Sequence, residues 1–442
     1  MAKRKSVETS SGMAVDEPVP DLSDVFIQVR LTTKSSKFAL PDVPYSLPGV
    51  TKSADLNIVI NQLLGEYAAE QWIPVEFDFL INGEILLQSV GEYIYERKIP
   101  SENVLEIEYI EHLPAPEPEA SLDHPDWVSA VQMLDDCILT GCYDNQVRVW
   151  TRKGALVLAH AAHISPVRAV AWVNVSDTEG SFLTSSHDQT VALWSLENRK
   201  TQHAAVTPKA FYRGHAASVD GLAVSPDAQK FCSVSFDKMV KIWSLSDTPS
   251  VESEETVEPA EKKLKGDGKK LTKTPEATLS GHKEAVSCCA WTAPSEIITA
   301  SWDHSIKIWD VELGGMSRQL DGTKAFLSIS YSPLSKLLIS GATDRIVRLY
   351  DPRSNEGSIV KIGFASHMGW VSSVAWSPTN ENLFISASYD KLMKMWDVRS
   401  PKSPVYDMAG HSDKILCSAW SNTNLLLSGG ADNDLKMFSA DV

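Results

Sequence analysis

Histidine and aspartate side chains that could do acid–base chemistry recur at a regular spacing through this 442-residue chain. Seven aspartates each lie six residues before an aromatic residue: Asp144, Asp188, Asp237, Asp303, Asp344, Asp390 and Asp432. A histidine lies 20 to 25 residues before six of them, at His124, His163, His215, His282, His367 and His411, and Thr323 stands in its place in the fifth copy. A His–Asp pair can act as the general base of a hydrolase. One active site does not need seven copies, so we interpret the pairs as a buried hydrogen-bond network that holds each repeat together.

Each copy of the repeat has the pattern of a strand, a tight turn and a second strand. The residue two positions before each Asp is small, as at Ser186 or Gly430, and an Asp carboxylate can accept backbone N–H bonds across a turn. Apolar residues alternate after the turn, as at Val147 and Val149, which is typical of a half-buried strand. The seven aspartates are therefore predicted to be structural turn residues.

The spacing of the repeats predicts the architecture. Successive motif aromatics are 44, 49, 66, 41, 46 and 42 residues apart. Repeats of about 40 to 45 residues with Gly-His and Trp-Asp motifs indicate a β-propeller with four strands per blade. The stretches GHKEAVSCCAW, SASWDHSIKIWD and SHMGWVSSVAWSP closely resemble the WD-repeat family. This resemblance implies a mostly β chain with a seven-bladed propeller over residues 123–442.

The one long spacing contains an insertion of unusual composition. Residues 246–276 carry almost no large apolar side chains, so we expect a disordered loop between the third and fourth blades. Its KKLKGDGKK stretch could be a nuclear or nucleolar address, an RNA contact, or only a solvated charge run. The AKRK stretch in the expected disordered tail, residues 1–23, leaves the same alternatives open.

Residues 24–111 have a different pattern and are expected to form a separate domain. Residues 25–33 and the following SKFALPDVPYSLP predict a hairpin, and residues 57–67 have helical spacing of apolar side chains. The stretches FDFLING, EILLQSV and NVLEIEYI return to strand character, and EILLQSVGEYIYERK as a whole is strand-like. This order resembles a ubiquitin-like β-grasp domain, although the segment lacks the Gly-Gly end needed for conjugation.

Residues 112–122, between the two expected domains, are predicted to close the propeller. The last motif ends at Phe438, which leaves four residues, too few for an outer strand in blade seven. The stretch HLPAPEPEASL precedes the first blade, and its prolines suit an edge strand, where a missing N–H is harmless. A plain linker is the alternative.

Composition excludes several classes of function. The net charge is −16, which disfavours general electrostatic binding to nucleic acid. There is no long apolar run and no apolar core near the start of the chain, so we expect an intracellular protein without a membrane span. The six cysteines show no zinc spacing and are expected to be reduced, and phosphate-loop, nucleophile-elbow and metalloprotease motifs are absent from the sequence.

The order of the segments resembles one family in particular. A ubiquitin-like domain followed by a seven-bladed WD propeller, with the stretches FDFLINGEILLQSV and HPDWVSAV, resembles the Ytm family of ribosome-biogenesis WD-repeat proteins. The notchless family shares the N-terminal domain type but normally has a longer propeller. The resemblance implies a non-enzymatic scaffold without cofactors, acting in the nucleus, nucleolus and nucleoplasm. Its expected role is large (60S) subunit assembly and pre-rRNA processing towards 5.8S and 25S/28S rRNA.

The resemblance also implies partners and one site residue. Ytm-family proteins bind the Bop scaffold protein through the propeller, in the PeBoW complex that also contains pescadillo. Their ubiquitin-like domain binds midasin, an ATPase that strips the complex from pre-60S particles. Glu102 is the residue expected to complete Mg²⁺ coordination in the metal-dependent adhesion site of midasin, with Glu92 and Glu96 as nearby competitors. Direct RNA contact stays open, and a substrate-receptor adaptor of a ubiquitin ligase is the alternative from another class.

An aromatic rim is the expected partner-binding surface. In WD propellers the residue before the turn Asp and the residue three after the His point to the same rim. Here these positions include Trp127, Tyr143, His187, Phe236, Trp302, Phe326, Trp370 and Tyr389. Exposed aromatic clusters mark binding sites, although such rings can also merely cover the loops of neighbouring blades.

Overall fold

The protein is described by a computed structural model for residues 25–67, 72–86, 88–100, 103–199, 204–246, 271–353 and 360–440. The chain divides into two compact units, Met1–His112 and Leu113–Val442, and each is considered by itself. The expected tail of residues 1–23 lies outside the described residues. Within the described part, no helix is long and apolar enough to cross a membrane.

The N-terminal unit is a mixed sheet with a helix packed against it. Its elements are β1 (Phe26–Thr32), η1 (Ser36–Phe38), β2 (Pro44–Pro48), α1 (Ser53–Tyr67), β3 (Phe77–Ile81), β4 (Glu84–Ile85), α2 (Val90–Arg97) and β5 (Leu105–Glu111). The strand order is β2-β1-β5-β3-β4, with β1 antiparallel to β2 and parallel to β5. Helix α1 buries Leu56, Ile60 and Leu64, which lie on one side of the helix because they are four residues apart. The expected β-grasp order of hairpin, helix and further strands is confirmed.

One part of this unit differs from the sequence prediction. The stretch EILLQSVGEYIYERK is strand-like only at Glu84–Ile85, and α2 follows from Val90 to Arg97. Ser89 Oγ accepts a hydrogen bond from the Glu92 N–H at 3.3 Å, and Glu92 Oε2 accepts one from the Ser89 N–H at 3.0 Å. This reciprocal capping box satisfies two N–H groups that the first helical turn leaves unpaired. The helix therefore begins where a strand was expected to continue.

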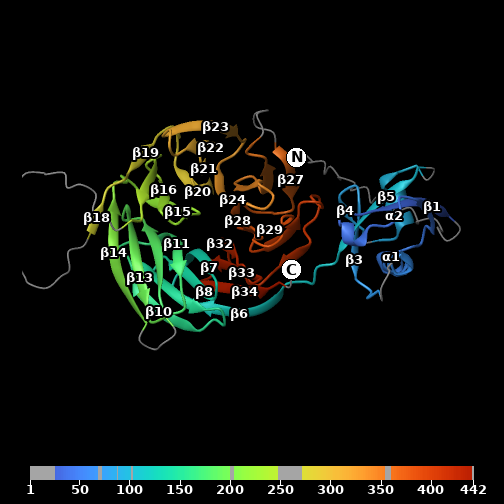
Figure 1. The fold of residues 1–442 in the computed structure, drawn as a ribbon, viewed down its shortest axis with the longest axis horizontal. Coiled ribbons are helices and arrows are strands. Elements are labelled where there is room, and N and C mark those ends of the chain that lie inside the picture. Colours follow the sequence, from blue (N-terminus) through green and yellow to red (C-terminus); the bar gives the residue numbers. More distant parts are fainter. Residues whose placement is uncertain are drawn as a thin grey trace, which may run out of the picture. The chain divides into compact units, whose positions relative to one another are not determined.

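The second unit is a seven-bladed propeller, and the innermost strand of each blade lies around the centre of the ring in Figure 1. Blade one contains β7 (Val128–Leu134), β8 (Cys137–Cys142), β9 (Gln146–Thr151) and β10 (Leu156–Ala161). Blade two contains β11 (Val167–Val175), β12 (Gly180–Ser186), β13 (Thr190–Glu197) and β14 (Ala205–Arg213). Blade three contains β15 (Val219–Val224), β16 (Lys230–Ser235), β17 (Val240–Ser244) and β19 (Ala277–Leu279). The four strands named for each of these blades pair antiparallel and lie side by side in the order in which they occur along the chain.

The remaining blades repeat the same plan. Blade four contains β20 (Val286–Ala293), β21 (Glu296–Ser301), β22 (Ser305–Asp310) and β23 (Gly315–Asp321). Blade five contains β24 (Phe326–Tyr331), β25 (Leu338–Ala342), β26 (Ile346–Tyr350) and β27 (Val360–Ala365). Blade six contains β28 (Val371–Trp376), β29 (Leu383–Ser388), β30 (Met393–Asp397) and β31 (Tyr406–Met408). Blade seven contains β32 (Ile415–Trp420), β33 (Leu425–Gly430) and β34 (Asp434–Ser439), with β6 (Glu117–Asp123) as its outer strand.

Strand β6 joins the beginning of the propeller to its end. It runs antiparallel to β34, with Asp123 opposite Asp434 and Glu117 opposite Ser439. Pro118 lies at the register shift of this ladder, opposite Phe438, at the outer edge of the sheet. A proline is tolerated on an edge strand, because the N–H that it lacks would face solvent there instead of a further strand. The closing segment starts further back, where the carbonyl of Leu113 accepts a hydrogen bond from Tyr406 Oη on β31 at 2.6 Å.

The insertion lies within blade three rather than between blades three and four, so its expected position was wrong. It connects β17 to β19, the third and the outer strand of the same sheet. The expected disordered range of 246–276 was also too long, because β18 (Leu271–Lys273) runs parallel to β14 and adds a fifth strand to blade two. Residues 247–270 lie outside the described part of the chain.

Serine side chains at the start of three inner strands connect neighbouring blades. Each hydroxyl donates to the first carbonyl of the next inner strand: Ser129 to Val167 at 2.6 Å, Ser287 to Phe326 at 2.8 Å, and Ser372 to Ile415 at 2.6 Å. At the same position in blade two, Arg168 forms an ion pair with Asp220 of blade three at 3.1 Å. These contacts fix the inner strands around the channel whose mouth carries the candidate site.

Candidate functional site

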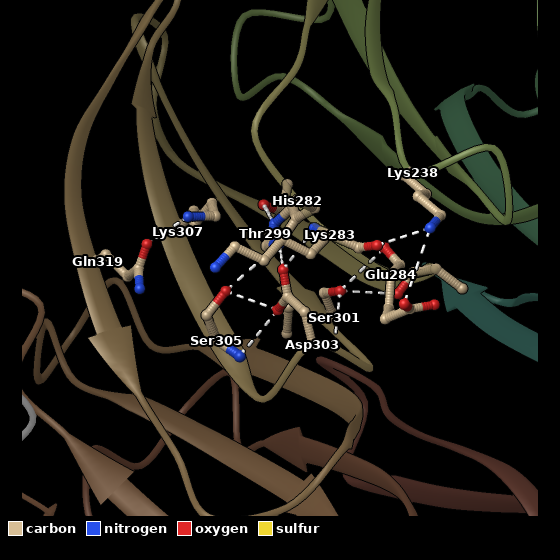
Figure 2. Close-up of polar contacts among 12 residues, drawn as sticks. Lys238, His282, Lys283, Glu284, Thr299, Ser301, Asp303, Ser305, Lys307 and Gln319 are labelled. Atoms are coloured by element: carbon tan, nitrogen blue, oxygen red, sulfur yellow. Dashed lines mark hydrogen bonds and ion pairs between the residues drawn. The ribbon is translucent and has the colours of Figure 1, made fainter.

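In blade four, the histidine and the aspartate of the repeat belong to one continuous series of hydrogen bonds (Figure 2). His282 Nδ1 lies 2.9 Å from Asp303 Oδ2, and His282 Nε2 lies 2.8 Å from Thr299 Oγ1. Trp309 Nε1 donates to the same threonine hydroxyl at 2.8 Å. Asp303 also accepts the Ser305 N–H at 2.9 Å, across the turn. Because a carboxylate only accepts hydrogen bonds, the His282 proton is on Nδ1. The side chains of His282, Asp303 and Thr299 all have hydrogen-bond partners.

The same His–Asp contact recurs in blades two, three, six and seven. The nitrogen–oxygen distances are 2.9 Å for His163–Asp188, 2.7 Å for His215–Asp237, 2.8 Å for His367–Asp390 and 3.0 Å for His411–Asp432. Burial alone would raise the pKa of these carboxyls, but hydrogen bonds from histidine and backbone donors outweigh it. The pKa is lowered to about 2 at Asp188, Asp237 and Asp390.

Burial decides between a catalytic and a structural role for these pairs. In the five blades the histidine side chains are 0–3% exposed and the aspartates 5–9% exposed. A substrate cannot reach such a pair, whereas a buried, fully satisfied polar chain fixes the turn between two strands. The five pairs are therefore structural.

In blades one and five the turn Asp is held by an arginine instead of a histidine. The prediction that His124 pairs with Asp144 was therefore wrong. His124 Nδ1 lies 3.0 Å from the Leu122 carbonyl, and Asp144 instead binds Arg148 at 2.5 Å. In blade five, where the histidine is missing, Asp344 binds Arg348 through both guanidinium Nη atoms. An arginine four residues after the Asp can reach back across the turn, and its planar fork matches a carboxylate.

The described residues offer no metal site of their own, because no three His, Cys, Asp or Glu side chains gather in one place. The six cysteines are all free, and Cys137, Cys142, Cys232 and Cys417 are buried. Burial raises the pKa of the Cys417 thiol to about 12, so this thiol is protonated and unreactive at neutral pH.

The rim residues come from two positions that one backbone hydrogen bond brings together in each blade. The residue before the turn Asp donates its N–H to the carbonyl of the residue just before the inner strand. The bond runs from Tyr143 to Trp127 at 3.0 Å in blade one and from Tyr389 to Trp370 at 2.9 Å in blade six. Side chains from both positions therefore emerge at the same edge of the blade, as the sequence pattern predicted.

Four of these rings are open to solvent, with exposed fractions of 40% for Trp127, 41% for Phe236, 43% for Trp302 and 49% for Trp370. Tyr143 and Tyr389 are half-buried, and His187 is exposed. Phe236 contacts Trp302 with ring centroids 5.2 Å apart. Scattered single apolar side chains are normal on a surface, but rings that touch each other form a patch.

The largest connected group of rim side chains spans blades six, seven, one and two, and we call it the aromatic arc. Its members are Trp370, Tyr389, Lys414, Trp127, Tyr143 and His187. Trp370 stacks on Tyr389 with centroids 5.7 Å apart, Trp127 contacts Tyr143 at 5.4 Å, and Tyr143 contacts His187 at 6.3 Å. Lys414 bridges the two groups of rings.

Phe326 does not belong to the rim, and its assignment is corrected. It is 1% exposed and is the first residue of β24, opposite Ala342, as Val371 opposite Ser388 is in blade six. The rim position of blade five is held by Ala325, whose carbonyl accepts the Thr343 N–H at 3.1 Å. Without a histidine in this copy, the count from Thr323 was one residue out of register.

Charged residues at the channel mouth were missed by the sequence analysis. Arg168 donates to Asp220 at 3.1 Å and also donates to the Tyr143 hydroxyl. Lys414 lies three residues after His411, the position that Trp127 and Trp370 hold in their blades, so the repeat spacing could have found it. These side chains line a cavity of about 470 Å³ at the channel mouth.

The expected metal-binding residue of the N-terminal unit, Glu102, lies outside the described residues. Its flanks are described, and the Asn103 N–H donates to the Pro100 carbonyl at 3.3 Å. The two competitors are both engaged. Glu92 belongs to the capping box, and Glu96 Oε2 accepts a hydrogen bond from Gln88 at 2.9 Å.

The fold and the buried His–Asp framework define a WD-repeat propeller protein with an additional N-terminal domain. The WD domain, G-beta repeat family matches residues 116–151, 154–195, 206–244, 273–310, 315–351, 357–397 and 402–439, and the NLE (NUC135) domain family matches residues 27–94. The chain is 46% identical over 420 residues to the ribosome biogenesis protein WDR12 homolog of Ixodes scapularis, covering 93% of this chain and 98% of that protein. It is 42% identical over 416 residues to the protein of the same name from Aedes aegypti, covering 94% and 96%. The chain therefore belongs to the WDR12 family of ribosome biogenesis proteins, which confirms the resemblance drawn from its motifs.

Proposed function

We propose that this protein is a non-enzymatic scaffold in ribosome biogenesis that binds protein partners through the aromatic rim of its propeller. The observation that carries the proposal is the group of exposed rings Trp127, Phe236, Trp302 and Trp370 at one edge of the blades. A few buried Trp or Tyr anchors supply most of the energy of a protein interface. The names of the relatives give the process, ribosome biogenesis.

The finer role follows from the family resemblance. The propeller binds the Bop-type scaffold protein and, together with pescadillo, forms the PeBoW complex on pre-60S particles. The complex supports pre-rRNA processing towards 5.8S and 25S/28S rRNA in the nucleolus and nucleoplasm. Nothing in this role requires a cofactor, and direct contact with rRNA is not part of the proposal.

The first test asks which complex the protein enters. Tagged full-length protein is isolated from cells, and its co-purifying proteins and RNAs are identified. The proposal expects the Bop protein, pescadillo and large-subunit pre-rRNA. Recovery of cullin-type ligase subunits without these three would instead assign the protein to the ubiquitin-ligase adaptors.

The N-terminal unit is proposed to bind midasin through Glu102. Glu92 is a poorer candidate, because its Oε2 already accepts the Ser89 N–H at 3.0 Å in the capping box at the start of α2. Mg²⁺ requires near-ideal octahedral oxygen ligands at about 2.0 to 2.1 Å. A carboxylate that is one methylene shorter therefore cannot easily reach the ion.

Glu102→Asp is expected to abolish midasin binding nearly as fully as Glu102→Ala, and removal of Mg²⁺ by a chelator should have the same effect. Glu96→Asp is the matched control, because the same change is made at a nearby carboxylate. Binding is measured with purified full-length protein and the adhesion domain of midasin. Normal binding by Glu102→Asp would show that another residue is the ligand.

A further inference from the structure

Lys414 lies at the centre of the aromatic arc. Its ammonium nitrogen is 5.7 Å from the ring centroid of Trp127 and 5.5 Å from that of Tyr389. A cation over an aromatic face is held by the ring quadrupole, and the rings restrict where the ammonium can move. Lys414 is also the residue directly before β32, so the innermost strand of blade seven positions its backbone. The charge is therefore held at a defined place at the channel mouth.

The charge of Lys414 is not neutralised by any carboxylate within ion-pair distance in the described parts of the chain. Arg168, the other cation of the same cavity, is different. Its guanidinium pairs with Asp220, which also accepts a hydrogen bond from Ser218 at 2.7 Å. One of the two cations is thus compensated within the protein, and the other is available to an incoming anion.

The surroundings of Lys414 suit a single carboxylate on an extended peptide. The cavity of about 470 Å³ is lined by the rings of Trp127, Tyr143 and Tyr389 and by several serine side chains. Aromatic walls can cover the carbon atoms of an acidic side chain while the ammonium pairs with its oxygens. Nucleic acid fits less well, because it gains affinity by pairing many phosphates with many cations, and the chain has a net charge of −16.

The insertion of this same chain, whose first half is acidic, does not start near this site. The turn at Asp237, between β16 and β17, is at the rim edge of blade three. Strand β17 runs from that turn towards the opposite edge, and the insertion follows its end at Ser244. The occupant is therefore better sought in another protein.

We propose that Lys414 and the rings beside it bind an acidic side chain from a segment of a protein partner that lies along the aromatic arc. The inference rests on the proposed function only in taking the rim edge as the partner-binding edge. It adds a chemical preference: the partner segment carries Asp or Glu where it crosses the channel mouth.

The test uses full-length protein and a fluorescein-labelled hexaglutamate peptide, with hexaglutamine as the uncharged control. Lys414→Met keeps the length and apolar stem of the side chain but removes its charge, and Lys414→Arg restores a cation. Lys324→Met is the matched control, because Lys324 is an exposed lysine just before blade five, outside the arc. Binding is followed by fluorescence anisotropy at low and moderate salt, and melting temperatures verify that each variant is folded.

We expect hexaglutamate, and not hexaglutamine, to bind the unmodified protein. Its affinity should fall at least tenfold in Lys414→Met and persist in Lys414→Arg and Lys324→Met. Equal affinity in Lys414→Met, or no binding of hexaglutamate to the unmodified protein, overturns the proposal. Tighter binding of a polyuridine RNA that is lost in Lys414→Met overturns it in favour of a nucleic-acid site. No natural partner is needed, so the outcome is independent of whether the Bop protein binds the rim.

Discussion

At the scale of single residues, the turn aspartates show two ways of holding the same turn. Five of them pair with a buried histidine, whereas Asp144 and Asp344 pair with an arginine four residues later. In blades three, four, six and seven the residue at that later position is a lysine: Lys241, Lys307, Lys394 and Lys436. Each of these lysines donates to the neighbouring outer strand instead, as Lys394 does to Asp407 at 2.9 Å. The arginine thus replaces the histidine rather than adding to it.

This difference predicts unequal effects of exchanging arginine and lysine. Arg348→Lys removes the two-point contact with Asp344 in a blade that has no histidine, so the carboxylate loses its main donor. We expect a loss of about 2 kcal/mol in unfolding free energy. It is measured as a drop of a few degrees in melting temperature by differential scanning calorimetry.

Lys307→Arg in blade four is the matched control. Asp303 keeps its bond to His282 at 2.9 Å, so this exchange should change the melting temperature much less. Equal effects of the two exchanges would contradict the division of the blades into histidine-held and arginine-held turns.

At the scale of elements, β6 decides whether the ring is closed. It supplies the outer strand of blade seven, and its Leu122 is 7% exposed and packs with Leu435 and Met437 in the core between blades seven and one. Truncating one buried leucine to alanine typically lowers the unfolding free energy by about 2 to 5 kcal/mol. Removing the strand would also leave the outer edge of β34 unpaired.

Deletion of residues 1–121 removes five of the seven residues of β6 and leaves Leu122 at a free chain end, so we expect a lower melting temperature of the propeller and a loss of more than about 3 kcal/mol in unfolding free energy. Deletion of residues 1–112 is the control, because it removes the N-terminal unit but keeps β6. Both truncated chains are compared with the propeller transition of the full chain. If the shorter deletion and the longer one melt at the same temperature, β6 does not hold the ring closed.

Sequence patterns predicted the elements that repeat, and they failed where a signal was local or shifted. The Asp-to-aromatic spacing located all seven turns between the second and third strands of the blades, since the four-stranded plan is the same in each. Helix α2 was missed because apolar residues near Ile94 suit a strand, while the deciding signal was the capping pair of Ser89 and Glu92. Phe326 was misplaced because its blade lacks the histidine from which the rim position is counted. Strand β18 could not be expected, because its three residues pair with a neighbouring blade rather than with an adjacent segment.

At the scale of the whole molecule, the propeller concentrates its exposed rings at one edge and buries its acid–base pairs. The rings Trp127, Trp302 and Trp370 are all at least 40% exposed, whereas His282 and His367 have fully buried side chains. A propeller built in this way has exposed rings with which to bind proteins, while its five His–Asp pairs are out of reach of a substrate. The chain belongs to the WDR12 family, whose members are ribosome biogenesis proteins.

The affinity of the rim variants for the purified Bop-type propeller, measured by isothermal titration calorimetry, tests this account most directly. The variants are Trp302→Ala, Trp370→Ala and Tyr389→Ala. The control is Leu313→Ala, which changes a side chain that is 84% exposed in the turn after β22, at the opposite edge of blade four. Loss of an anchor ring is expected to cost about 2 kcal/mol, or about 30-fold in affinity, in at least one of the three rim variants, with Leu313→Ala unchanged. Unchanged affinity in all three rim variants would contradict the account and place the interface elsewhere on the molecule.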